Sequence, residues 1–250
     1  NLIDRAKAAG CSALVITLDL QILGQRHKDI RNNMTAPPKL SIKNMINMAT
    51  KPRWCMGMLG TKRHDFANII GHATGVESLT SLSEWSANNL LKTLNWDDLD
   101  WMIKRWGGKV VLKGIQDVED AKMAVKTGAD AIVVSNHGGR QLDGALSSIR
   151  SLPDIIDAVG DDIEVWMDSG IRSGQDVAKA VALGAKGVMI GRPFVYGLGA
   201  MGQAGVTKVL DIIHKELDTT VALCGERCVD GMDRDNLLVP KGFRGDWEMM

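Results

Sequence analysis

AVKTGADAIVVSNH, residues 124–137, shows the pattern that decides the fold of this chain. A helical segment ends at Gly128, a residue type that suits the left-handed turn closing many helices. Apolar, mostly β-branched residues follow and end in polar ones. The stretches AKAAGCSALVITLD (6–19) and AVALGAKGVMIGRP (180–193) repeat this order. Strands that are apolar throughout are buried on both faces, so the repeat indicates a parallel sheet covered by helices.

Further elements fit between these repeats. Strands are expected at 110–113 and 163–168, and helices at 118–127 and 175–183, with Ser173 as the cap of the second helix. This alternation of strands and helices predicts an α/β fold with parallel strands.

Each of the five expected strands ends in polar residues. These are Thr17 and Asp19, then Lys113, then Ser135 and His137, then Asp168, and finally Gly191 and Arg192. The carboxyl ends of all strands meet at one mouth in a (β/α)8 barrel, but spread along an edge in a doubly wound sheet. Strand ends of such different chemistry favour the (β/α)8 TIM barrel. Because the chain has five clear strand–helix units and starts at Asn1, we expect it to lack the first three strands, as an N-terminally truncated chain.

Composition limits the partners and the compartment. Thirty basic and thirty acidic residues cancel, which argues against nucleic acid as a partner. The four scattered cysteines are typical of reduced thiols in a cytosolic protein. Cys224 and Cys228 lack a second ligand pair, so no metal site is expected. No apolar run is long enough to span a membrane.

The expected organisation is a single partial barrel domain over residues 1–250, with a long basic loop excursion at about 21–108 and a surface tail at about 229–250. Residues 25–65 hold nine basic residues against two acidic ones, together with several Met and a Trp. Such a segment is typical of contact with a membrane surface or an acidic partner. An active-site lid packed on the barrel is the alternative, and both interpretations stay open.

The strand end at residues 135–140 has the composition of a catalytic site. His137 titrates near neutral pH and can act as a base, and Arg140 can grip a carboxylate at two points. Asp19, at another strand end, could orient the imidazole. These residue types suit removal of a proton next to a carboxylate. A Ser-His-Asp hydrolase is disfavoured because Ser135 shares the strand with His137 and no G-x-S-x-G elbow exists.

A second group of residues indicates a phosphate-bearing ligand. Arg172 and Arg192 follow two strands, near a glycine-rich turn and a helix N-terminus, which together favour a phosphate. Lys113 is either a Schiff-base nucleophile or a fixed charge beside an anionic cofactor, with a solvent-reaching lysine as the bland alternative. The G-x-G-x-x-G match at 197–202 does not follow a strand directly and is discounted as a dinucleotide site.

Three stretches together closely resemble the FMN-dependent α-hydroxy-acid dehydrogenase and oxidase family. They are SNHGGRQLDG (135–144), DSGIRSG (168–174) and GRPFVYGL (191–198), and the match extends along nearly the whole chain. The segments around KPRW (51–54) and LNWDDLDWMIKRW (94–106) are most similar to the bacterial respiratory L-lactate dehydrogenases (cytochrome).

The resemblance implies a barrel with FMN at its C-terminal mouth. It assigns His137 as the catalytic base with Asp19 as its partner, Arg140 and Arg26 as ligands of the substrate carboxylate, and Lys113 as a catalytic charge beside the flavin. Its cofactor contacts map onto Thr17, Lys113, Ser135, Asp168, Ser169, Gly170, Ile171, Arg172, Gly191 and Arg192. Many members have Gly where this chain has Ser169; Ser is expected to be tolerated there because only the backbone N–H is used.

The expected function is FMN-dependent oxidation of an L-2-hydroxy acid, L-lactate to pyruvate, with electrons passed to a quinone or cytochrome. Hydride transfer and a carbanion route both stay open. One alternative is an oxidase that uses oxygen, as glycolate oxidase does. Another is an inactive barrel fragment that needs a partner or its missing N-terminal part, because family members carry a further N-terminal portion. The resemblance also implies a homo-oligomer. The expected location is cytoplasmic and peripheral on the inner face of the cell membrane, through residues 25–65.

Overall fold

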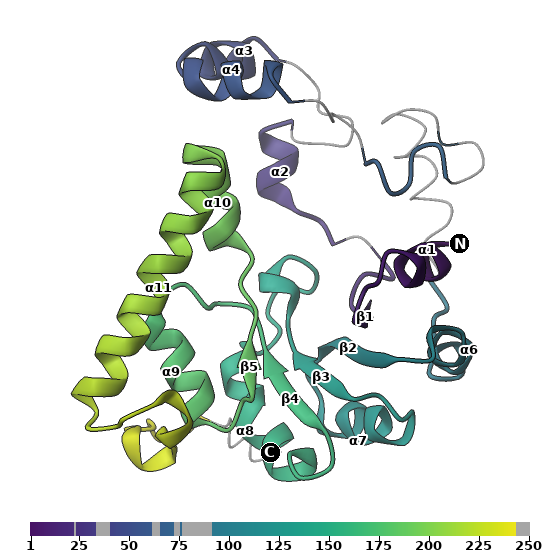
Figure 1. The fold of residues 1–250 in the computed structure, drawn as a ribbon, viewed down its shortest axis with the longest axis vertical. Coiled ribbons are helices and arrows are strands. Elements are labelled where there is room, and N and C mark those ends of the chain that lie inside the picture. Colours follow the sequence, from purple (N-terminus) through teal and green to yellow (C-terminus); the bar gives the residue numbers. More distant parts are fainter. Residues whose placement is uncertain (23, 34–40, 62–65, 73–75, 77–91, 244–250) are drawn as a thin grey trace.

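The computed structural model describes residues 1–22, 24–33, 41–61, 66–72, 76 and 92–243 (Figure 1). Within them lies one parallel sheet, whose strands are β1 (Ala13–Thr17), β2 (Lys109–Ile115), β3 (Ala131–Val134), β4 (Glu164–Met167) and β5 (Gly187–Val188). Each strand pairs with the next one along the chain, in the order β1-β2-β3-β4-β5. A doubly wound sheet reverses its order at a switch point, so this order is that of consecutive barrel strands. The predicted α/β class and barrel topology are confirmed.

Helices cover the outer face of the curved sheet, as Figure 1 shows for α6 to α9. The α-helices on the body are α1 (Leu2–Ala8), α6 (Asp97–Trp106), α7 (Val118–Lys126), α8 (Ser148–Val159), α9 (Gly174–Ala182), α10 (Arg192–Met201) and α11 (Gln203–Leu223). Three others, α2 (His27–Arg31), α3 (Ile42–Ala49) and α4 (Pro52–Leu59), lie beyond the carboxyl ends of the strands, at the top of the view.

Alternation along the strands divides the core into two layers. The outward-facing residues of β2 to β4, such as Leu112 and Ile132, are fully buried beneath the helices. The inward-facing residues Val111, Ala131 and Val133 form a separate cluster inside the barrel. Lys113, Ser135 and Asp168 continue the inward-facing positions of their strands. These three polar side chains therefore lie directly above the inner apolar cluster, at the mouth of the barrel.

The ends of α9 show why the predicted helix forms where it does. Ser173 accepts a hydrogen bond from the backbone N–H of Asp176, and the Asp176 carboxylate accepts one from the backbone N–H of Ser173. This reciprocal capping satisfies two donors that the first turn would otherwise leave unpaired. The helix predicted at 175–183 is confirmed within one residue at either end.

The last part of the predicted loop excursion is packed structure. Helix α6 lies on α1, with Leu99 and Trp106 buried. An ion pair joins the two helices, with Arg105 Nη2 at 2.8 Å from Asp4 Oδ2. Residues 97–106 therefore belong to the body of the domain, while much of the remaining excursion lies outside the described residues.

The predicted surface tail also packs in its described part. Met232 is buried against α9 and α11, and Leu237 and Phe243 contact the core. Arg150 donates hydrogen bonds to the carbonyl oxygens of Gly242 and Phe243. These contacts hold residues 229–243 against the surface of the domain. Residues 244–250 lie outside the described part.

The G-x-G-x-x-G match at 197–202 serves helix packing. Gly197 lies inside α10, and a Cβ there would lie 2.5 Å from the carbonyl oxygen of Gly205 in α11. The two helices thus cross at their glycines, and the stretch does not follow a strand as a dinucleotide loop must.

Among the described helices, none has both the length and the hydropathy to cross a membrane.

Candidate active site

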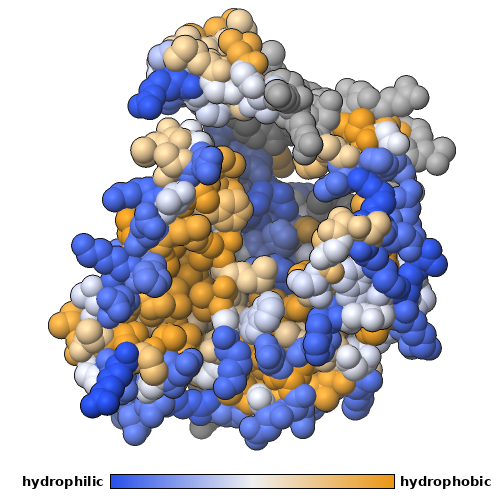
Figure 2. Space-filling view, viewed as in Figure 1, coloured by the Kyte–Doolittle hydropathy of each residue, from blue (hydrophilic) through white to orange (hydrophobic). Residues whose placement is uncertain are grey.

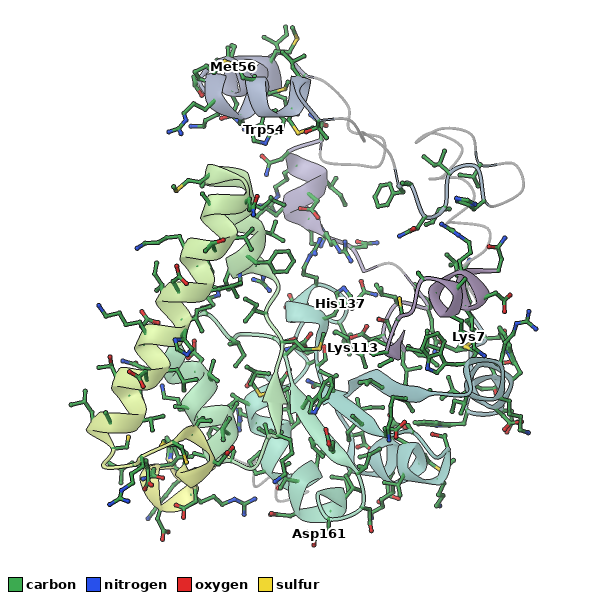
Figure 3. The ribbon with its side chains drawn as sticks, in the orientation of Figure 1. Lys7, Trp54, Met56, Lys113, His137 and Asp161 are labelled. Atoms are coloured by element: carbon green, nitrogen blue, oxygen red, sulfur yellow. The ribbon has the colours of Figure 1, made fainter. Side chains whose placement is uncertain are left out.

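The imidazole of His137 lies at the centre of the mouth, paired with a carboxylate from another strand end. Its Nδ1 is 3.0 Å from Asp19 Oδ1, and both side chains are largely buried. Figure 3 shows His137 and Lys113 near each other at the carboxyl ends of the strands, with Asp161 at the opposite end of the barrel. The carboxylate orients the ring, so the other ring nitrogen is free to act as a base.

The side chain of His137 is oriented by a strained turn. The alternation of side chains along β3 does not set its direction, because the strand ends before it. Strand β3 ends at Val134, and His137 begins a short 3-10 turn with φ of 54°. A non-glycine residue in this left-handed region costs of the order of 1 kcal/mol and persists only where its surroundings hold it. Here the hydroxyl of Ser135 accepts the backbone N–H of His137 at 3.1 Å. Ser135, expected to contact the flavin, is buried and holds the backbone of His137.

Asp19 reaches His137 because β2 carries a glycine beside it. A Cβ on Gly114 would lie 2.9 Å from the Asp19 carboxyl carbon, closer than atoms can approach. The second carboxylate oxygen, Oδ2, is buried and has no hydrogen-bond partner among the described residues. Since buried polar atoms are almost always paired, this acceptor is available to a bound molecule.

Arg26 and Arg140 lie beside the pair of His137 and Asp19, and Asp29 alone does not balance their two positive charges. Burial and the neighbouring Arg140 lower the pKa of Arg26 from its ordinary value, and Asp29 offsets part of this effect. Arg140 Nη2 is 3.6 Å from Asp29 Oδ2, and Arg26 Nε is buried without a partner among the described residues. A carboxylate ligand would supply the missing charge. Sequence reasoning missed Asp29, whose only signal is its place in a mostly basic segment.

Lys113 is a fixed charge on the floor of the mouth. Its Nζ is 2.8 Å from Asp168 Oδ2 and 2.8 Å from Ser135 Oγ, and its side chain is only 15% exposed. The solvent-reaching alternative is therefore wrong. An ammonium held by a carboxylate favours the role of a charge beside an anionic ring over that of a free amine nucleophile.

The hydroxyl of Ser169 is used, contrary to expectation. Its Oγ accepts the backbone N–H of Gly138 at 2.9 Å and donates to Asp168 Oδ1 at 2.8 Å. The residue holds a left-handed backbone with φ of 69°, a conformation that suits glycine. Ser169 thus connects the loop after β4 to the loop that carries His137.

A cavity of about 370 Å³ joins these groups. Its lining includes every predicted site residue except Thr17, Asp19, Arg26 and Ser135. Asp19 and Ser135 contact lining residues directly, Arg26 lies beside Arg140, and Thr17 is the register partner of Lys113. Figure 2 shows a polar recess here, between the body and the helices above it.

The lining also contains residues that sequence reasoning missed. They are Met189, Ile190, Pro193 and Val195. The end of the apolar run 187–190 was their only signal. A larger hollow of about 650 Å³ lies between α8, α9 and residues 236–243; it is mainly apolar and shares only residues 169–171 with the site. The paired ionisable groups are in the smaller cavity, which we take as the site.

The cavity has one helix N-terminus suited to a phosphate. The first turn of α9 is already occupied, because Ser173 and Asp176 cap it and Glu216 accepts the N–H of Gly174. Helix α10 begins at Arg192 without a side-chain cap. The Arg192 guanidinium itself donates to the carbonyl oxygen of Gly138. Of the two helix ends, α10 therefore fits an anion better.

Proteins of one enzyme family resemble this chain over nearly its whole length. A family model described as FMN-dependent dehydrogenase matches residues 1–239. The chain belongs to this family. An L-lactate dehydrogenase of Caulobacter sp. (strain K31) is 46% identical over 242 residues, covering 95% of this chain and 62% of the relative. The chain thus spans about three fifths of the length of that relative.

Solved structures of the family have the same fold. The monotopic membrane protein (S)-mandelate dehydrogenase matches with a TM-score of 0.87 and 33% identity, over 94% of this chain and 62% of that one. A mandelate oxidase variant matches with a TM-score of 0.67 and 34% identity, over 93% of this chain and 57% of that one.

The residues present fit the cofactor of the family. A buried lysine and an aspartate lie on the floor of the cavity, and an uncapped helix start with Arg192 lies at its rim. The lysine suits an anionic ring, the aspartate suits a hydroxylated chain, and the helix start with its arginine suits a phosphate. Among the described residues, no cluster of His, Cys, Asp or Glu is arranged to hold a metal.

Proposed function

We propose that the protein oxidises an L-2-hydroxy acid, L-lactate to pyruvate, with FMN as its cofactor. The observation that carries this is the pairing of His137 with Asp19 beside two arginines, at the edge of a cavity suited to a flavin. A base next to a carboxylate site is what the reaction of a 2-hydroxy acid requires.

Arg26 and Arg140 would hold the substrate carboxylate. Arg26 is the stronger candidate, because it is partly buried and its Nε has no partner among the described residues. Arg140 is half-exposed and shared with Asp29, so it can turn toward a ligand at little cost. Gripping the carboxylate orients the hydroxyl-bearing carbon toward His137.

His137 would take a proton from the hydroxy acid. Asp19 holds Nδ1, so Nε2 is the basic atom, and the carboxylate stabilises the imidazolium that forms. Both side chains are largely buried, which strengthens their interaction.

FMN, when bound, would accept the two electrons of the substrate. Lys113 would provide a fixed positive charge for the ring, and Asp168 and Ser169 would bind the hydroxylated chain of the cofactor. Thr17, the register partner of Lys113, would contact the ring from the neighbouring strand. The turn Gly170, Ile171 and Arg172, together with Gly191 and Arg192, would hold the phosphate end.

Anaerobic mixing of the FMN-loaded protein with L-lactate tests the proposal. We expect the oxidised flavin absorbance to bleach with L-lactate and to persist with D-lactate as the control. Persistence of the oxidised spectrum with L-lactate would reject the function.

An oxidase is the second candidate, supported by the likeness to mandelate oxidase. It would pass the electrons to oxygen and form one peroxide per substrate in air. A dehydrogenase would instead need a quinone or cytochrome acceptor. We favour the dehydrogenase because of the relative's name and the apolar hairpin described next.

The hairpin of α3 and α4 would place the protein on a membrane surface. Trp54 and Met56 lie on this hairpin, far from His137 in Figure 3. Ile42 and Leu59 are 79% and 85% exposed, with basic residues on the same two helices. Exposed apolar and basic side chains together suit an anionic bilayer. Some of the predicted basic residues of 25–65, such as Lys39 and Lys62, lie outside the described part.

The free cysteines and the apolar surface of α10 and α11 support proposals on the location and the assembly of the protein. The four cysteines are free, which suits a cytoplasmic protein at the inner face of the membrane. Apolar surface gathers over α10 and α11 in Figure 2, and Leu198 and Met201 on α10 are exposed. Such a surface suits a homo-oligomer. We treat residues 1–250 as one FMN-binding barrel domain.

A further inference from the structure

The side-chain amide of Gln141 makes four hydrogen bonds to one loop. Nε2 donates to the carbonyl oxygens of Asp19 at 2.9 Å and Ile22 at 2.6 Å. Oε1 accepts from the backbone N–H of Gly24 at 3.3 Å and from Arg26 Nη2 at 3.2 Å. A primary amide has two donors and two acceptor sites, so its capacity is fully used. The partners also set its orientation, since two carbonyls lie on the nitrogen side and two donors on the oxygen side.

The same two segments approach each other at their backbones. A Cβ on Gly24 would lie 2.6 Å from the carbonyl oxygens of both Arg140 and Gln141. No other residue type fits at position 24 without separating them. A glycine on one segment and an amide on the other therefore form one contact.

This contact joins the two halves of the proposed site. The first segment carries Asp19 and Arg26, and the second carries His137 and Arg140. Each lies past the end of its strand, so sheet hydrogen bonds do not set their separation. Gln141 binds the backbone of Asp19 and the guanidinium of Arg26 at once.

We propose that Gln141 is a positioning residue that holds the acid partner and the carboxylate-binding arginine at working distance from His137. It acts through Asp19 and Arg26 and is absent from the cavity lining. This role rests on the proposed function only for its catalytic consequence. The contact itself can be tested without turnover.

Gln141→Met tests the role, because methionine keeps the length and removes all four hydrogen bonds. In the FMN-loaded protein we expect KM for L-lactate to rise about 10-fold and the rate of flavin reduction to fall at least as much. FMN affinity should stay within about 2-fold, since Gln141 does not line the cavity. Gln25→Met, in the same loop but exposed, is the matched control and should change neither value.

Two readouts need no reaction. Amide hydrogen exchange in residues 18–26 should accelerate in Gln141→Met, while exchange in β2, β3 and β4 stays slow. Binding of oxalate, a carboxylate without a hydroxyl to oxidise, should weaken about 10-fold, measured by the flavin spectrum. If the wild type fails to oxidise L-lactate, the proposed function is wrong, and exchange and oxalate binding still decide the role of Gln141.

Two further variants keep the proposal testable if Gln141→Met fails to fold. Gly24→Ala separates the same segments from the other side and should reproduce the exchange and oxalate effects. Gln141→Glu keeps the acceptor for Arg26 but turns a second oxygen toward two carbonyls, so it should restore only part of the binding. Unchanged exchange and oxalate affinity in both Gln141→Met and Gly24→Ala would overturn the proposal, as would faster exchange throughout the sheet with loss of FMN.

Discussion

His137 Nδ1 lies 3.0 Å from Asp19 Oδ1, although 118 residues separate the two in the chain. The pair joins the loops after β1 and β3, with β2 between them in the sheet. Gly114 on β2 makes the approach possible, because any side chain there would meet the carboxylate. The geometry of this pair, which we propose as catalytic, therefore depends on three strands and one glycine.

Replacing Asp19 with Asn should leave the ring without its orienting charge. We expect the rate of anaerobic flavin reduction to fall about 10²-fold or more, because the imidazolium is no longer stabilised. FMN affinity should be retained, as judged by the bound flavin fraction. A variant that reduces at the wild-type rate would show that the pair is not catalytic.

Arg26→Lys should weaken substrate binding. Lysine cannot reproduce the forked guanidinium, so KM should rise by about 10-fold to 100-fold, with a smaller change in the reduction rate. Arg31→Lys, exposed on α2, is the control. Because burial and Arg140 lower the pKa of Arg26, a bound anion should also raise the melting temperature of the wild type more than that of Arg26→Lys.

Substitutions of Ser169 should separate backbone strain from hydroxyl function. Ser169→Ala keeps a side chain at φ of 69° and loses the bonds to Gly138 and Asp168, so it should be destabilised by about 1–2 kcal/mol. Ser169→Gly relieves the strain and should stay within about 1 kcal/mol of the wild type in chemical denaturation. Both should slow flavin reduction alike; a slow rate in only one would contradict a role for the hydroxyl.

Polar substitution of the α3–α4 hairpin should release the protein from vesicles. Replacing Ile46, Trp54 and Leu59 with Ser removes exposed apolar surface, and vesicle partitioning should fall by at least about 10-fold. Leu210 and Leu223 on α11, also exposed, are the matched control positions. Flotation with anionic and neutral vesicles measures the effect, and equal flotation of both variants would exclude the hairpin as the contact.

The ion pair between α1 and α6 predicts an acid-dependent contribution to stability. Hydrogen bonds from Arg105 and, to a smaller extent, from the N-terminal ammonium of Asn1 lower the pKa of Asp4 from 3.8 to about 2. A depressed folded-state pKa stabilises the protein above the unfolded value, and this is lost as pH falls from about 4 toward 2. Asp4→Asn should therefore melt slightly below the wild type at neutral pH, and the gap should close near pH 2. A gap that stays constant over this range would show that the pair has no such linkage.

Local pattern determined much of the fold. The repeated order of helix, glycine, apolar strand and polar strand end predicts the sheet, because strand burial and helix termination depend on neighbouring residues. The cap at Ser173 is set within four residues and places α9 correctly. Parallel strands also bring their carboxyl ends together, so the strand-end positions of Lys113 and Asp168 predicted a shared mouth.

Only the tertiary structure decided how the site groups pair. His137 is aimed by a left-handed turn, Ser169 uses its hydroxyl, and Gln141 binds the distant loop that carries Asp19. These contacts link segments far apart in the chain, and they depend on close backbone approach at Gly24 and Gly114. Such approach is a property of packed loops in three dimensions, whereas strand and helix patterns arise from near neighbours. The sequence by itself therefore determined which residues would gather at the mouth, and packing decided which atoms would meet.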